Sequence, residues 1–117
     1  APADTTAIRG VIEQQLAAFG RDDGPGAFAF ASPGIREKFG SPEIFMEMVR
    51  RHYPPVYRPA GVAFQALEDS PRGLVQEVLL TGSDGRSVTA LYIMERQPDG
   101  SWRIDGVYLL EAPDLTT

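Results

Sequence analysis

The sequence predicts an α+β domain in which N-terminal helices pack on a curved antiparallel β-meander. Two observations support this fold class. Apolar residues recur at helical spacing before the Pro54-Pro55 pair, and β-rich segments separated by turn residues follow it. Helices followed by strands, rather than alternating with them, are typical of α+β proteins. The length of 117 residues suits one domain, spanning 1–117, with an ordered core expected over about residues 5–111.

The first predicted helix begins with Asp4 or Thr5 as its N-cap and ends at Gly20. Its apolar residues fall three or four positions apart, which places them on one helical face: Ile8, Val11, Ile12, Leu16 and Phe19. Gln15 follows Ile8 by two helical turns and returns to the same face. We expect Gln15 to make a helix–helix hydrogen bond, with a ligand contact as the alternative.

Shorter helices are expected next. The alternation in Ala27–Ala31 would suit a strand, but its alanines favour a short helix. Ser32-Pro33 and Ser41-Pro42 each combine an N-cap residue with a proline at the first helical position. They predict a short helix over Gly34–Phe39 and a longer one from Pro42 to about Tyr53, which the Pro54-Pro55 pair ends.

The second half of the chain predicts a meander of strands. Its β-rich segments are Val62–Leu67, Leu74–Thr81, Val88–Arg96 and Trp102–Leu110. Ser83-Asp84-Gly85 and Pro98-Asp99-Gly100 place Asp-Gly between such segments, where glycine can adopt the positive φ of a tight hairpin. We therefore expect neighbouring strands to pair in sequence order.

Composition excludes several functional classes. The chain has 11 basic and 16 acidic residues, a net charge of −5, and its basic residues are scattered, so nucleic acid is not an expected partner. No apolar run approaches the roughly 20 residues of a membrane span, so no membrane insertion is expected. With no cysteine and one histidine, disulfides and multi-histidine metal centres are excluded, and no cofactor motif occurs. We expect no cofactor and no metal.

Two positions could support acid–base chemistry. His52 follows Val49 and Met48 on one helical face, so we expect its ring to point inward, either as a core histidine or as a functional one. Alternation in the last strand predicts Trp102, Ile104, Gly106 and Tyr108 on one face and Arg103, Asp105 and Val107 on the other. Asp105 would be a general acid or base if its face lines an apolar cavity, and otherwise an arginine-paired carboxylate facing solvent.

A basic and aromatic patch lies between the predicted helices and strands. Residues 50–59 contain three arginines and two tyrosines, which could bind a carboxylate or phosphate ligand. The alternative is that Arg50 and Arg51 neutralise the carbonyl end of the preceding helix. The candidate ligand-binding residues of the whole chain are His52, Tyr53, Tyr57, Tyr92, Asp105, Arg51 and Gln15.

Several segments, Ala29–Ile35, Phe45–Val49, Tyr53–Pro59 and Asp99–Val107, together resemble a bacterial family of domains of unknown function, number 4864. The resemblance extends from about Ile8 to Leu110. It implies the cone-shaped fold of nuclear transport factor 2-like proteins, also described as cystatin-like, in which a curved sheet wraps around a long helix. That superfamily includes ketosteroid isomerases, whose cone holds one tyrosine and two aspartates. No catalytic residue of theirs can be aligned with this chain.

The expected function is non-catalytic binding, inside the cone, of a small apolar or anionic ligand or of a protein partner. We expect Phe19, Phe45, Met48, Tyr53 and Tyr92 to line the cavity. One alternative is a cofactor-free acid–base enzyme, of isomerase or dehydratase type, that uses Asp105 or His52 with a tyrosine hydroxyl. Another is a structural module that forms a homodimer through the exposed face of its sheet.

The first residues, Ala1-Pro2-Ala3-Asp4, read like a terminus left by signal-peptide cleavage. We therefore expect a periplasmic or secreted protein, with a cytoplasmic location as the alternative.

Overall fold

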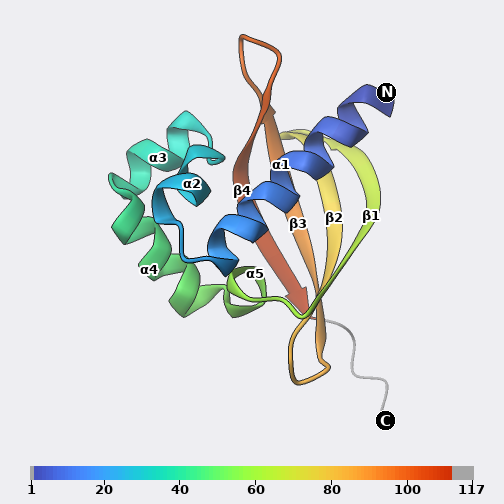
Figure 1. Cartoon of the computed structure of the whole chain (residues 1–117). Coiled ribbons are helices and arrows are strands. Elements are labelled where there is room, and N and C mark those ends of the chain that lie inside the picture. Colours follow the sequence, from blue (N-terminus) through green and yellow to red (C-terminus); the bar gives the residue numbers. More distant parts are fainter. Residues whose placement is uncertain (1, 112–117) are drawn as a thin grey trace.

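The computed structural model describes residues 2–111, in which five helices precede a four-stranded antiparallel sheet (Figure 1). The predicted α+β class is confirmed. The helices are α1 (Pro2–Gly20), α2 (Gly24–Ala29), α3 (Pro33–Phe39), α4 (Pro42–His52) and α5 (Pro54–Tyr57). The strands are β1 (Gly61–Ser70), β2 (Gly73–Thr81), β3 (Ser87–Arg96) and β4 (Trp102–Glu111).

The start of α1 differs from the prediction. Asp4 and Thr5 lie inside the helix, which begins at Pro2, so neither is its N-cap. The apolar face begins only at Ile8 and gives no sign of the polar turn before it. That turn is nevertheless compatible with a helix, because proline is accepted at the first position and the carboxylate of Asp4 interacts favourably with the N-terminal dipole.

The serine caps of the short helices are confirmed. The Ser32 hydroxyl accepts a hydrogen bond from the Ile35 amide at 3.2 Å, and the Ser41 hydroxyl accepts one from the Ile44 amide at 3.3 Å. The helix predicted within Ala27–Ala31 is present as α2, which starts earlier. The proline pair ends α4 as predicted, but it also begins α5, because prolines fit the first turn of a helix.

The sheet has the predicted meander order, β1-β2-β3-β4. Gly85 and Gly100 have φ values of 82° and 88° in the two hairpins that Asp-Gly predicted. In Figure 1, α1 lies across one face of the sheet, and α2, α3 and α4 gather beside β4. On the opposite face of β4, Tyr108 and Leu110 are each 51% exposed.

The first bend of the sheet lies in β1. Its register with β2 shifts between Phe64 and Leu67, which leaves the carbonyls of Gln65 and Ala66 out of the regular ladder. The buried side chain of Gln76 donates hydrogen bonds to these carbonyls at 3.0 and 3.3 Å. A polar residue on the core face thus stabilises an irregular strand, a role that the alternating pattern did not reveal.

A second irregularity lies in β4 and contradicts the predicted alternation. Gly106 pairs with Ile93 and Ile104 pairs with the next residue, Met94, so Asp105 is the extra residue of a β-bulge. Beyond the bulge the faces exchange. The residues of β4 that face the core are therefore Trp102, Ile104, Val107 and Leu109, while Tyr108 faces away from it.

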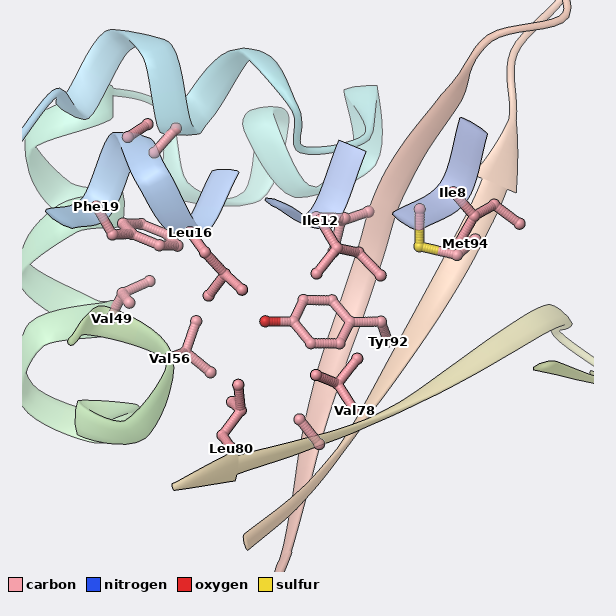
Figure 2. Close-up of a cluster of buried hydrophobic side chains, with 14 of the residues drawn as sticks. Ile8, Ile12, Leu16, Phe19, Val49, Val56, Val78, Leu80, Tyr92 and Met94 are labelled. Carbon is pink, nitrogen blue, oxygen red and sulfur yellow. The ribbon is translucent and has the colours of Figure 1, made fainter. Parts of the chain in front are cut away.

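The main core lies between α1 and the sheet. Figure 2 shows Ile8, Ile12, Leu16 and Phe19 of α1 facing Val78, Leu80, Tyr92 and Met94 of β2 and β3. The segment before α3 covers the free edge of β4. The Ser32 amide donates a hydrogen bond to the Ile104 carbonyl at 2.9 Å, and the Ile104 amide donates one to the Phe30 carbonyl at 2.8 Å. This pairing fixes α3 beside β4. Within residues 2–111, no helix combines the length and apolar character needed to cross a membrane.

Candidate functional site

A pocket of about 270 Å³ lies between the helices and β4. Its floor consists of buried apolar side chains: Phe19, Phe45, Val49, Val56 and Ile104. Partly buried apolar residues of α3, α4 and β4 extend the wall: Ile35, Phe39, Met48 and Val107. The volume is close to the lower end of the range for small-molecule sites.

Phe45 lies at the centre of an aromatic cluster, of which Phe19, Phe39 and Phe45 line the pocket. Its ring lies 6.0 Å from that of Phe19, 5.4 Å from that of Phe28 and 5.8 Å from that of Phe39, measured between ring centroids. These tilted and edge-on arrangements are favourable for aromatic pairs. Because the rings come from α1, α2, α3 and α4, this aromatic cluster is a product of tertiary packing.

Asp105 is the acidic residue of the pocket. The bulge in β4 turns its carboxylate toward Ser32, whose buried hydroxyl donates a hydrogen bond to Oδ1 at 2.7 Å. The other carboxylate oxygen lies 3.6 Å from Nη2 of Arg72, and the Asp105 side chain is 26% exposed. Asp105 is therefore held from two sides, and Ser32 both caps α3 and joins that helix to β4.

Arg72 reaches the pocket from the turn between β1 and β2. Its Nη1 donates a hydrogen bond to the Tyr108 hydroxyl at 2.7 Å, and its guanidinium carbon lies 5.9 Å from the centroid of that ring. Sequence reasoning missed both residues as site candidates. No local signal could have identified Arg72, because its contact with β4 depends on the curvature of the sheet.

Lys38 is the second basic residue of the pocket and the only lysine of the chain. Its ammonium nitrogen lies 5.5 Å from the centroid of the Phe39 ring. Lys38 and Arg72 are both exposed, so they lie where the pocket opens, and we call this pair the basic rim. Two cations against the single carboxylate of Asp105 give the pocket a local excess of positive charge in a chain of net charge −5.

Three of the predicted ligand-binding residues line the pocket: Gln15, Tyr53 and Asp105. Gln15 also makes the expected helix–helix hydrogen bond, which its buried amide nitrogen donates to the Ala27 carbonyl at 3.1 Å. Of the residues expected to line a cavity, four do so, Phe19, Phe45, Met48 and Tyr53, whereas Tyr92 does not.

The inward orientation predicted for His52 is wrong, because the residue is exposed. The buried face of α4 consists of Phe45, Met46 and Val49. A stripe centred on these residues continues to Tyr53, which packs against the core, and not to His52. His52 and Asp105 therefore do not converge on one reacting atom, as joint acid–base chemistry would require.

The basic and aromatic patch of residues 50–59 contacts a carboxylate of the chain itself. Tyr57 donates a hydrogen bond to Asp22, Arg58 contacts Asp22 at 2.8 Å, and Arg50 lies 3.9 Å from it. The hydrogen bond from Tyr57 and, after it, the contact with Arg58 hold the pKa of Asp22 below its ordinary value. Arg51 pairs with Glu47 at 2.9 Å. Neither Arg51 nor Tyr57 lines the pocket.

Tyr92 occupies the core instead of the pocket. Its side chain is 0% exposed, and its hydroxyl has no hydrogen-bond partner among the described residues. Burial raises the pKa of Tyr92 well above its ordinary value, so the phenol stays protonated at neutral pH. In the described part of the chain, no three His, Asp or Glu side chains form a group that could hold a metal ion.

Comparison with known proteins identifies one family. The domain of unknown function DUF4864 matches the chain over residues 1–117. No curated protein and no solved structure shows a significant match.

Proposed function

The chain belongs to the family of domains of unknown function DUF4864, and we propose that it binds a small apolar molecule carrying an acid group in the pocket beside β4. The observation that carries this proposal is the pairing of a buried apolar floor with the basic rim of Lys38 and Arg72. An apolar body would be removed from water against the floor. Its acid group would remain at the opening, where the two cations favour negative charge.

Binding without catalysis is favoured by the state of the polar groups. Asp105 already accepts a hydrogen bond from Ser32 through one carboxylate oxygen and lies 3.6 Å from Arg72 through the other, so both oxygens are engaged by the chain itself. The exposed His52 supplies no second acid or base in the pocket. The polar groups of the site are therefore suited to orienting a ligand.

Calorimetry with decanoate and decanol tests this proposal. Decanoate is expected to bind more tightly than decanol and to raise the melting temperature, because a ligand that binds only the folded state stabilises it. Lys38→Ala and Arg72→Ala should each weaken decanoate binding about two- to fivefold, the size of an exposed charge pair, and leave decanol unaffected.

Arg86→Ala is the matched control. Arg86 lies in the turn between β2 and β3, is almost fully exposed and pairs only loosely with Asp84, at 3.9 Å. Its loss should leave the affinity for decanoate unchanged. Equal affinities for decanoate and decanol would contradict the role of the basic rim, and binding of neither would contradict the proposed function.

We also infer that the fold is of the nuclear transport factor 2-like type and that the chain forms a homodimer. The long α1 lying across a bent meander supports the first inference. The exposed Leu110 on the sheet face away from the core, which does not line the pocket, supports the second. Light scattering tests the homodimer, since Leu110→Arg should shift the mass toward the monomer and a wild-type monomer at high concentration would contradict it.

A further inference from the structure

The hydroxyl of Tyr92 has no structural role in the core. The residue is fully buried on β3, and its hydroxyl oxygen has no hydrogen-bond partner within the part of the chain that the structure describes. A buried hydroxyl without a partner destabilises the folded state, and phenylalanine would fill the same space without that cost. Packing therefore explains the ring of Tyr92 but not its hydroxyl.

The direction of the ring relates this hydroxyl to the pocket. Figure 2 shows the Tyr92 ring extending from β3 past Ile12 and Val78, with its oxygen pointing toward Leu16 and Val56. Val56 also belongs to the floor of the pocket. The apolar floor thus separates the ligand site from a hydrogen-bond donor.

The element that carries Val56 is small. It is α5, a helix of 4 residues between Tyr53 and Arg58. On the surface, Tyr57 and Arg58 tie this helix to Asp22, while Val56 is the buried residue of the helix. A ligand in the pocket would reach the Tyr92 hydroxyl by displacing the Val56 side chain.

We propose that Tyr92 is the hydrogen-bond donor at the inner end of the ligand site, and that the ligand carries an acceptor oxygen, such as a carbonyl, at the end opposite its acid group. This inference rests on the proposed function and specifies its ligand class as oxo acids with an apolar body. The protonated phenol donates to the inner oxygen while Lys38 and Arg72 face the acid group. A ligand without that oxygen leaves the hydroxyl unpaired and binds more weakly.

The test compares decanoate with the oxo acid of the same length whose carbonyl lies next to the terminal methyl group. Wild-type protein should bind the oxo acid up to about tenfold more tightly, the contribution of one hydrogen bond. Tyr92→Phe should abolish this preference and raise the melting temperature of the free protein, because it removes an unpaired buried hydroxyl. A purely structural tyrosine would not alter the ratio of the two affinities.

Tyr57→Phe is the control for loss of a phenol outside the pocket. It removes the bond to Asp22 and loosens α5, which should change both affinities alike and leave their ratio as in the wild type. The infrared carbonyl stretch of the bound oxo acid is an independent measurement on wild-type protein. A shift to lower frequency is expected from a hydrogen bond.

The possible results separate this inference from the proposed function. If the wild type binds both acids equally, or if the carbonyl stretch is unshifted, the role of Tyr92 is wrong and the proposed function stands. The same holds if Tyr92→Phe keeps the preference for the oxo acid. If the wild type binds neither acid, the proposed function and this inference fail together.

Discussion

Two clusters of aspartate, arginine and tyrosine stand in contrast. In the surface cluster, Asp22 is held by Arg50, Tyr57 and Arg58, and both arginines also lie against the Tyr57 ring. In the pocket cluster, Asp105 is held by Ser32 and Arg72, and Arg72 also bonds Tyr108. The residue types are nearly the same, but the pocket beside β4 is lined by Asp105, Arg72 and Tyr108 and by none of the residues of the surface cluster.

The difference shows that residue chemistry does not by itself make a binding site. The carboxylate of Asp22 already pairs with the two cations of its cluster, Arg50 and Arg58. The backbone of Asp22 adopts the left-handed conformation, with φ of 54°. In the pocket cluster, Asp105 faces Arg72, and Lys38 has no carboxylate partner among the described residues. The pocket that these residues line has apolar walls. The pocket cluster therefore combines an unneutralised cation with apolar surface, which the surface cluster lacks.

Ser32→Ala should have the largest effect on stability. The substitution removes the cap of α3 and the hydrogen bond to the Asp105 carboxylate, for a combined loss of about 3 kcal/mol in the free energy of unfolding. Ser41→Ala removes only a cap, that of α4, and should cost about 1 kcal/mol. Urea denaturation measures both losses. Equal losses would mean that the bond between Ser32 and Asp105 contributes nothing to stability.

Asp105→Ala should have the next largest effect. It leaves the buried Ser32 hydroxyl without its acceptor, at a cost of about 2 kcal/mol. Asp105→Asn keeps an acceptor for Ser32 but loses the charge that faces Arg72, so it should cost less. Asp22→Ala, in the exposed cluster, should cost less than Asp105→Ala in the same urea series. The reverse order would contradict the distinction between the two clusters.

Helices α1 to α4, the strand order and the serine caps could be predicted because each depends on local chemistry, whereas α5 was missed because its two prolines were taken only as a helix end. Ser32-Pro33 and Ser41-Pro42 carry their signal in adjacent residues, and Asp-Gly marks the hairpins in the same way. The face of Asp105 could not be predicted, because a single bulge residue reverses the alternation that follows it.

The site itself was predictable only in part. Gln15 and Tyr53 belong to apolar helical stripes, so their place beside the pocket follows from periodicity. The concentration of charge in residues 50–59 drew attention to a patch that binds its own Asp22. Lys38, Arg72 and Tyr108 lie far apart in the sequence, and only the curvature of the sheet and the position of α3 assemble them at one pocket.

The smallest expected effect is a pH dependence that belongs to the surface cluster. The folded-state pKa of Asp22 lies below the ordinary value of an aspartate, so its contribution to stability is present above that ordinary value and is lost as pH falls through the lower, folded-state pKa. Asp22→Asn should remove that part of the acid-induced loss and flatten the stability curve on the acidic side. Arg58→Ala should flatten it as well, because it removes a contact that lowers the pKa of Asp22. Melting temperatures recorded from neutral to strongly acidic pH measure the effect. If the melting temperature of the variant fell with pH in parallel with that of the wild type, Asp22 would titrate with an ordinary pKa. The surface cluster would then stabilise the carboxylate no more than water does.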